Sequence, residues 1–313
     1  MAKFAKPATQ AASVMKRMQG GAIRSVGTVR NYELRLKLVT QWVQQNRLGS
    51  LRELTPERAL DYLRQRAAQV GQKTLDMDRQ AIQMMMRQVT GQLAEGQTLQ
   101  VIKSTAPERP RTARAKPGQP NNLGRRLAEQ SRLYTRQQIS LIAERQAAHN
   151  ALATEIAAAA GLRAHELLTL RRIHHRVPDE RPAHALKFCG IRENTIAYTV
   201  HGKGGLTREV RIPLELARQL EATRLQEPRQ VTDRGVHYQQ VYNIGGGQAW
   251  SESFSSASKT ALGWSNGAHG LRHAYAQERL STLQRQLTRQ EALRVVSQEM
   301  GHFRAEITEV YLR

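Results

Sequence analysis

The chain has 313 residues and a formal net charge of +22, from 48 Lys and Arg against 26 Asp and Glu. This length allows two domains with a hydrophobic core each, and the excess of positive charge indicates a polyanionic partner, with nucleic acid as the first candidate. A solubilising surface or a ribosome-associated protein would also account for the charge. A membrane-surface role is disfavoured because the basic residues are dispersed along the chain.

The composition also limits location and covalent chemistry. The longest apolar run, near residues 156–162, is too short to cross a bilayer, and residues 1–20 are polar and basic, unlike a secretory signal. Cys189 is the only cysteine, which excludes an intramolecular disulfide and a cysteine-built zinc site. We therefore expect a cytoplasmic protein with no metal and no other cofactor.

The N-terminal third predicts a basic arm followed by a small helical domain. Residues 1–22 show no clear amphipathic period, so a flexible arm is expected there. Over residues 23–103, apolar side chains recur at steps of three and four from Val29 to Val43, and Thr55-Pro56 is a typical helix start. A third helix is expected over about 73–89, and Leu93–Ile102 is a candidate for a fourth.

Residues 104–130 break this periodicity. Between Ser104 and Arg126 there are four prolines, two glycines and six Lys or Arg against one Glu, a composition that predicts a linker. We expect its basic side chains to follow a DNA backbone or to solvate a hinge, and both can be true. They are Arg109, Arg111, Arg114, Lys116, Arg125 and Arg126.

Residues 131–313 predict a mainly α domain with a small antiparallel β-sheet. Thr195–His201 and Thr207–Pro213 have the pattern of paired strands around a Gly-Lys-Gly-Gly turn, and 245–247 is expected to be a loop. A helical pattern returns from Ser131, with Ile139, Leu141 and Ile142, and further helical patterns occupy 151–160, 214–226, 253–262, 271–283, 289–301 and 306–312.

The last forty-five residues contain the groups that metal-free phosphodiester chemistry needs. A phosphate in a five-coordinate transition state requires cations on its equatorial oxygens, a proton carrier and a nucleophile. His269, Arg272, His302 and Tyr311 are of these types. Each is common in structural roles when taken singly, so the ordered set carries the inference.

This ordered set resembles the tyrosine recombinase (integrase) family. The family signature is His-x-x-Arg, then Gly-His, then Tyr nine residues after that second His, as in 269–272, 301–302 and 311. Gly161-Leu162-Arg163, with Glu166 three places on, matches the family's upstream Arg turn, and Lys203 in the hairpin turn matches its Lys. Phe303 stands where a Ser commonly follows the Gly-His motif. The resemblance implies a catalytic domain over 131–313 and a helical core-binding (SAM-like) domain over 23–103.

The resemblance also implies a role for each residue of the set. Tyr311 would attack a DNA phosphate and form a 3′-phosphotyrosyl bond, without metal or ATP. Arg163 and Arg272 would hold the non-bridging oxygens by two-pronged hydrogen bonds, and His302 would donate a further one. Lys203 would protonate the leaving 5′ oxygen, and His269 would take the tyrosine proton. Glu166 and His273 would support these groups.

The partners follow from the same resemblance. They are double-stranded DNA, further copies of a monomer that assembles into a tetramer on two DNA sites, and accessory DNA-bending proteins, all in association with the nucleoid. Relatives usually carry a helix after the tyrosine that docks into a neighbouring subunit. Because only two residues follow Tyr311, the arm with Phe4, Val14, Met15 and Met18 becomes the candidate for that contact.

Two other functions remain open at this level. A type IB topoisomerase shares the catalytic set and the fold of its domain, and a basic DNA-binding protein without catalysis would share the charge. A metal-dependent nuclease is disfavoured, because no carboxylate or cysteine spacing accompanies the histidines at 174, 175, 184 and 201, and those at 165 and 237 are expected to lie on the surface.

Overall fold

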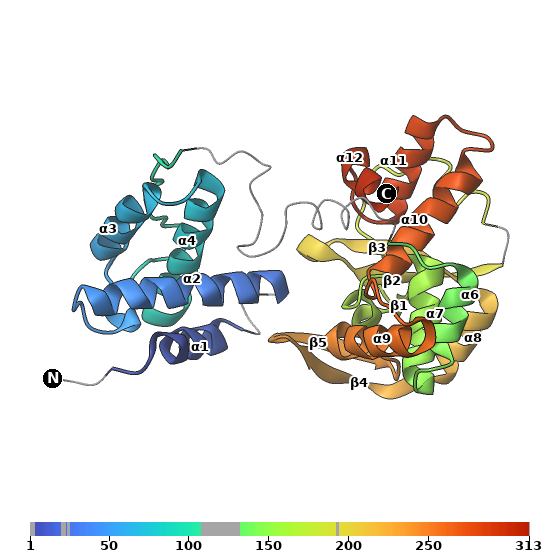
Figure 1. The fold of residues 1–313 in the computed structure, drawn as a ribbon, viewed down its shortest axis with the longest axis horizontal. Helices are drawn as coiled ribbons and strands as arrows, with labels where there is room; N and C mark the ends of the chain where they lie inside the picture. The colour runs from blue at the N-terminus through green and yellow to red at the C-terminus, as the bar shows by residue number, and fades with distance from the viewer. Residues whose placement is uncertain (1–3, 20–22, 24–25, 108–131, 192–193, 313) are drawn as a thin grey trace. The chain divides into compact units, whose positions relative to one another are not determined.

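The computed structural model describes residues 4–19, 23, 26–107, 132–191 and 194–312. Contacts within the chain divide it into two compact units, Met1–Gln119 with Arg234–His237, and Pro120–Asp233 with Tyr238–Arg313 (Figure 1).

The N-terminal unit is built from helices. They are α1 (Pro7–Met18), α2 (Val26–Gln45), the short turn η1 (Leu51–Glu53), α3 (Pro56–Ala67), α4 (Gln72–Met85) and the π-helical turn η2 (Met86–Thr90). The predicted helix start at Thr55-Pro56 is confirmed. The Thr55 side chain accepts a hydrogen bond from the Arg58 amide at 3.4 Å, and Pro56 occupies the first helical position.

The prediction of a flexible arm over residues 1–22 is wrong for Pro7–Met18, which forms α1. Ala11, Val14, Met15 and Met18 are buried on one face of this helix, and α1 packs along α2 (Figure 1). Their spacing of three, one and three residues is that of an amphipathic helix, partly hidden in the sequence by the surrounding Ala and Gln. Because three of the four proposed contact residues are buried in their own unit, only Phe4, which is 49% exposed, remains available for a partner.

The candidate helix Leu93–Ile102 is absent, because this segment is an irregular chain. Gly91 has φ +68° and Gly96 has φ +86°, conformations that end a helix. Leu93 and Leu99 are nevertheless buried. Their spacing therefore reflects packing of an extended segment onto the helices.

A buried carboxylate lies within the helical unit. Asp78 on α4 is fully buried and pairs with Arg35 of α2 at 3.3 Å and with Arg66 of α3 at 3.2 Å. Burial raises the pKa of Asp78, and the two guanidinium groups oppose this effect. The ion pairs thereby join three helices at one point.

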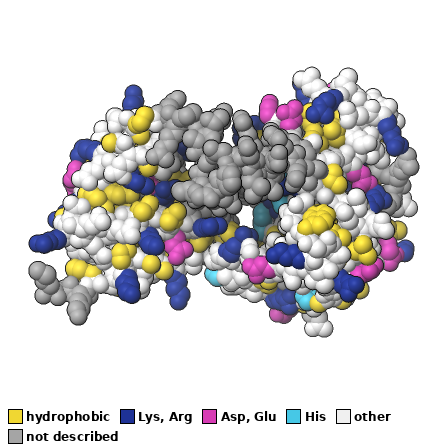
Figure 2. All heavy atoms as spheres, in the orientation of Figure 1, with side chains coloured by type: hydrophobic (Ala, Val, Ile, Leu, Met, Phe, Trp, Pro, Cys, Tyr) yellow, Lys and Arg dark blue, Asp and Glu magenta, His cyan; other side chains and the backbone are white. Residues whose placement is uncertain are grey.

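The surface of this unit is basic over a wide area. Figure 2 shows Lys and Arg side chains spread across its visible face among apolar side chains, with few acidic ones.

Among the described residues of the whole chain, no helix is both long and apolar enough to cross a membrane.

The C-terminal unit is mainly helical and contains two small antiparallel sheets, as the fold class predicted. One sheet has the strand order β1–β2–β3 and the other is the hairpin β4–β5, apart from residues Arg234–His237 at its turn, which are grouped with the N-terminal unit. In chain order the elements are α6 (Arg136–Ala143), α7 (Ala148–Ala160), η3 (Glu166–Thr169), β1 (Arg171–Arg172), β2 (Thr195–His201), η4 (Lys203–Gly205), β3 (Thr207–Pro213), α8 (Leu214–Ala222), β4 (Arg224–Asp233), β5 (Val236–Tyr242), α9 (Gly247–Leu262), α10 (Gly270–Leu283), α11 (Arg289–Glu299), α12 (Ala305–Thr308) and η5 (Glu309–Leu312).

The predicted strand pair is confirmed with the bounds expected from the sequence. β2 and β3 pair from Thr195 opposite Pro213 to His201 opposite Thr207, and η4 forms the turn between them. Side chains at alternate positions, such as Val210 and Ile212, are buried against α7.

The segment after α8 departs from the prediction. The helix expected over 214–226 ends at Ala222, and β4 and β5 follow as a hairpin that the sequence did not indicate. Most side chains of β4 are exposed, so the strand lacks the alternation of apolar and polar residues that identifies a half-buried strand. The next helix, α9, begins at Gly247 rather than Ser253.

Two hydrophobic clusters organise the unit. The larger one surrounds α7, whose Ala153, Ile156 and Ala157 are fully buried against the sheet and α9. The second joins α10, α11 and Tyr311, and α10, α11 and α12 lie close together in Figure 1. Tyr311 is therefore fixed in place by packing against side chains of α10 and α11.

Candidate active site

Most of the predicted site residues meet in the C-terminal unit, although they are far apart in the sequence. They come from the turn after α7, the first turn of α10, the turn after α11, and η5. In that order they are Arg163 and Glu166; His269, Arg272 and His273; His302; and Tyr311.

The turn after α7 depends on Gly161. This residue ends the helix with φ +60°, and a Cβ placed on it would lie 2.6 Å from the ring of Tyr275. A side chain is excluded there for both reasons. The Gly161 carbonyl accepts hydrogen bonds from two buried guanidinium groups, those of Arg272 and Arg208.

Glu166 is the buried anion of the site. Its Oε1 accepts a hydrogen bond from Arg163 Nη1 at 2.7 Å, and its Oε2 accepts one from Arg208 Nη2 at 2.8 Å and lies 3.7 Å from Arg272 Nη1. Burial by itself would raise the pKa of Glu166, but the charges of Arg208, Arg163 and Arg272 outweigh it and hold the pKa well below its usual range. One carboxylate thus faces three guanidinium groups, which leaves the site with an excess of positive charge.

Arg272 is fully buried beneath the other site residues. Its Nη1 donates to the Gly161 carbonyl and its Nη2 donates to the Met300 carbonyl at 3.1 Å. Burial, followed by the charge of Arg163, lowers the pKa of Arg272 to about 10, so the guanidinium stays charged at neutral pH. Among the described residues, Arg272 Nε has no hydrogen-bond partner. An unpaired buried donor costs about 1–3 kcal/mol, and native structures retain such groups for a reason.

His302 is fixed by contacts on both ring nitrogens. Nε2 lies 3.3 Å from Arg272 Nη2, and Nδ1 lies 3.3 Å from Thr308 Oγ1. Because a guanidinium can only donate, Nε2 must accept, which assigns the ring proton to Nδ1. In this conformation His302 supports Arg272, and its Nε2 carries no proton to donate to a phosphate.

Tyr311 lies in a cage of three imidazoles and one guanidinium. Its ring centroid is 5.3 Å from that of His269, 4.9 Å from that of His273 and 5.1 Å from that of His302. Arg272 Cζ is 5.5 Å from the same centroid. The side chain is 8% exposed, so most of the ring is covered.

The pKa values of the three histidines are all shifted downward. Burial, followed by the charge of Arg272, lowers the pKa of His302 to about 3. Loss of contact with water, followed by the charge of Arg272, also lowers the pKa of His269, although part of this residue remains exposed. Burial also lowers the pKa of His273, against the effect of a hydrogen bond to the Tyr311 backbone. These downward shifts favour the neutral form of all three rings at neutral pH, and they make each ring a weaker base.

Other predicted residues lie partly or wholly outside the described residues. The backbone of Lys203 forms part of η4, at the turn of the β2–β3 hairpin, but its side chain is outside them. The six basic linker residues, Arg109, Arg111, Arg114, Lys116, Arg125 and Arg126, also lie outside them. Their proposed contacts with DNA remain predictions.

Sequence reasoning missed the buried groups that hold the set together. Arg208 of β3 is 3% exposed and bridges Glu166 and the Glu299 carbonyl. Glu299 is buried as well, and its carboxylate accepts hydrogen bonds from Arg279 and Tyr275. A signal for Arg208 was present. It shares the face of β3 with Val210 and Ile212, and a charged residue at an inward position of a strand needs a buried partner.

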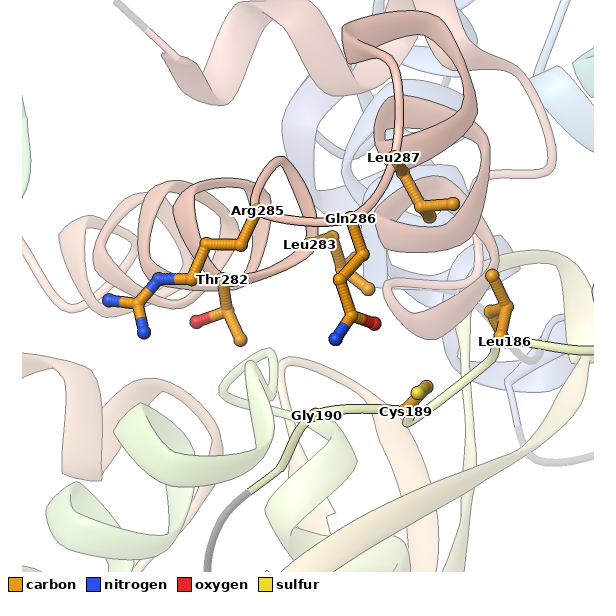
Figure 3. A pocket seen from close by; sticks show the side chains of 8 residues that line it. All are labelled: Leu186, Cys189, Gly190, Thr282, Leu283, Arg285, Gln286 and Leu287. Carbon is orange, nitrogen blue, oxygen red and sulfur yellow. The ribbon is translucent and has the colours of Figure 1, made fainter.

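Two cavities of this unit lie away from the candidate site. The one in Figure 3 has a volume of about 180 Å³. Gln286, beyond α10, points toward Cys189 and Gly190, whereas Arg285 extends to the side. A larger hollow of about 910 Å³ lies among α6, α7, α8 and α10. Neither is lined by Arg163, His269, Arg272, His302 or Tyr311.

The remaining histidines form no metal site among the described residues. There, no group of three His, Cys, Asp or Glu side chains is arranged to hold an ion. The rings of His174 and His175 contact each other at a centroid distance of 4.1 Å, and His201 Nδ1 lies 3.0 Å from Thr207 Oγ1.

Comparison with known proteins finds similarity at the level of solved structures alone. No family model and no curated protein matches the chain. The crystal structure of XerA recombinase is 16% identical, covers 98% of this chain and 94% of its own, and has a TM-score of 0.38. XerH site-specific recombinase bound to palindromic difH substrate in a post-cleavage complex is 14% identical, covers 100% and 94%, and has a TM-score of 0.45. A lambda integrase(75-356) dimer bound to a COC' core site is 16% identical, covers 97% and 94%, and has a TM-score of 0.43.

Proposed function

We propose that the protein is a site-specific DNA recombinase or integrase that cleaves and rejoins strands through a 3′-phosphotyrosyl bond at Tyr311. One observation carries this proposal: a largely buried tyrosine ring lies against Arg272 and three imidazoles. A phenol, a fixed cation and candidate proton carriers thus converge within one cluster, as transfer of a phosphodiester to tyrosine requires.

The cations of the site suit a phosphodiester. Arg163, Arg208 and Arg272 face the single carboxylate of Glu166, so one further anion would be attracted to the cluster. Arg163 keeps 17% of its side chain exposed and is accessible to a phosphate. The unpaired Nε of Arg272 supplies a donor for a non-bridging oxygen once the Tyr311 ring moves off the guanidinium.

The proposed reaction balances without an external energy source. Tyr311 Oη forms a bond to phosphorus while the bond between phosphorus and the 5′ oxygen breaks. His269, whose ring centroid lies 5.3 Å from that of Tyr311, takes the phenol proton. Lys203 gives a proton to the departing oxygen and leaves a 5′ hydroxyl. Attack by a 5′ hydroxyl of another strand reverses these steps and joins it to the 3′ end.

The rest of the chain would bind DNA and assemble the complex. We assign the helical N-terminal unit to the core-binding role and residues 104–130 to a linker that follows the backbone, since both are basic. Exchange between two duplexes would require four protomers. With α1 packed into its own unit, the contact between protomers would come from other surfaces of the two units.

A trapping experiment tests the proposal. The protein is incubated, in EDTA and without ATP, with labelled DNA from the ends that flank its gene, and the reaction is stopped with SDS. We expect a covalent protein–DNA band for the wild type and none for Tyr311→Phe, which loses only the hydroxyl and should still retard the DNA. A band of equal intensity from the Phe variant would overturn the assignment of Tyr311.

A supercoiled plasmid separates the alternatives. Exchange between paired sites indicates a recombinase, whereas relaxation that does not depend on the site indicates a type IB topoisomerase. Retardation without any strand breakage indicates a DNA-binding protein with no catalysis.

A further inference from the structure

Arg208 is a buried charge in the middle of an apolar face. It lies on β3, five residues after Lys203 on the same hairpin, and its side chain is 2% exposed. Val210 and Ile212 occupy the next two inward positions of the strand and are buried in the core around α7. An isolated charge there would be costly, so its partners determine what the residue does.

The guanidinium of Arg208 reaches two segments that carry proposed catalytic residues. Nη2 donates to Glu166 Oε2 at 2.8 Å and lies 3.4 Å from the Gly161 carbonyl, in the turn that bears Arg163. Nη1 donates to the Glu299 carbonyl at 2.6 Å, at the end of α11 and three residues before His302. One planar group therefore connects the hairpin, the Arg163 turn and the His302 turn.

Arg272 makes a second connection between the Arg163 turn and the His302 turn. It donates to the Gly161 carbonyl and to the carbonyl of Met300, the residue after Glu299. Two guanidinium groups thus hold the same pair of segments through consecutive carbonyls. Arg208 also packs tightly against the His302 turn, since a Cβ on Gly301 would lie 2.7 Å from Arg208 Cδ. Displacement of Arg208 would consequently disturb the turn that precedes His302.

We propose that Arg208 is a positioning residue that sets the Arg163 turn, the His302 turn and the Lys203 hairpin relative to one another. This inference rests on the proposed function, in which Arg163 and Lys203 act on one phosphate and His302 supports Arg272. Arginine is required because its flat, forked head donates in two directions at fixed geometry. A lysine supplies one compact charge and cannot bind Glu166 and the Glu299 carbonyl in the same way.

The first test needs no DNA. In Arg208→Met, hydrogen exchange should accelerate at two amides from separate segments: Arg163 N, which donates to Glu166 Oε2 at 2.8 Å, and His302 N, which donates to Ser297 O at 2.9 Å. Arg211→Met is the matched control. It removes an arginine from the same strand that pairs with Glu209 rather than with the site, and it should leave both amides unchanged. Unchanged exchange at both amides in Arg208→Met would overturn the inference, whether or not the protein proves to be a recombinase.

The second test measures cleavage at saturating DNA. Arg208→Met should form the Tyr311 adduct about 10²-fold more slowly than the wild type, the effect typical of removing a positioned group, with DNA affinity changed less than roughly threefold. Arg208→Lys keeps the charge and guards against a folding defect, and its rate should stay below about a tenth of the wild-type rate. Full activity of either variant would overturn the inference.

A double-substitution cycle identifies the route of the effect. If Arg208 acts through Glu166, then Arg208→Met combined with Glu166→Gln should be no slower than the slower single variant. Rate reductions that multiply would contradict this route and place Arg208 outside the Glu166 network. A wild-type protein that forms no adduct would contradict the proposed function, and the exchange measurement would then decide the inference on Arg208.

Discussion

The ring of Tyr311 covers the guanidinium of Arg272, with Arg272 Cζ 5.5 Å from the ring centroid. Arg272 has no exposed surface, and both of its Nη atoms are already bound to carbonyl groups of the chain. We therefore expect a phosphate that contacts Arg272 to displace the ring. In the free protein the proposed nucleophile lies against the proposed phosphate-binding cation, and we expect DNA binding to move the ring away from it.

Removing the ring should consequently strengthen phosphate binding. The contact between a guanidinium and an aromatic ring contributes about 0.5–2 kcal/mol. We expect Tyr311→Ala to bind DNA at least roughly twofold more tightly than Tyr311→Phe, because the Phe ring still covers Arg272. Titration by fluorescence anisotropy at low salt checks this, with the melting temperature of each variant as the control for folding. Equal affinities would mean that the ring is no obstacle to phosphate.

Lys203 is expected to act on the leaving oxygen. Lys203→Ala should cleave ordinary DNA slowly, yet recover when the scissile 5′ oxygen is replaced by sulfur, a leaving group that needs little protonation. The rate of adduct formation on the two substrates provides the measurement. Arg272→Ala serves as the control and should show no such recovery, because the phosphate charge remains uncompensated with either leaving group. Failure of sulfur to rescue Lys203→Ala would indicate that the lysine only binds phosphate.

The linker is expected to bind the DNA backbone irrespective of sequence. Changing Arg109, Arg111, Arg114 and Lys116 to Gln should weaken binding to all sequences alike. The slope of log affinity against log salt should fall by roughly 0.9 for each phosphate that the variant no longer neutralises. Lysine in place of the three arginines preserves the charge and should preserve the slope. If the Gln variant keeps the wild-type slope, the linker does not touch DNA.

His302 should make the fold sensitive to mild acid. Its pKa is about 3 in the folded protein, against an ordinary value near 6.5, so the unfolded chain binds a proton that the folded chain does not. The free energy of unfolding should therefore fall as pH drops from about 6.5, and continue to fall toward about 3. His269 and His273 act in the same direction.

Thermal unfolding between pH 7 and pH 5 separates the contribution of His302, because carboxylates of the unfolded chain are still largely ionised there. We expect the melting temperature of the wild type to fall more steeply over this range than that of His302→Gln. Parallel curves would show that His302 is not held neutral in the folded state.

Local sequence patterns predicted those elements whose own residues carry a strong periodicity. The β2–β3 hairpin and most helices of the C-terminal unit lie where the sequence indicated, since their apolar residues repeat at two or at three to four positions. α1 and the β4–β5 hairpin were missed. In α1 the buried face is interrupted by small and polar residues, and in β4 the side chains are mostly exposed, so the pattern that normally reports burial was weak.

The sequence by itself determined the candidate groups, because the order and spacing of Arg163, His269, Arg272, His302 and Tyr311 can be read from the printed chain. Only the tertiary structure decided the burial, the protonation and the hydrogen-bond partners of these groups. The burial of Arg272, the tautomer of His302 and the partnership of Arg208 with Glu166 depend on segments about 30 to more than 100 residues apart in the chain. Desolvation and hydrogen bonding at these contacts arise only when the segments meet, so no local pattern specifies them.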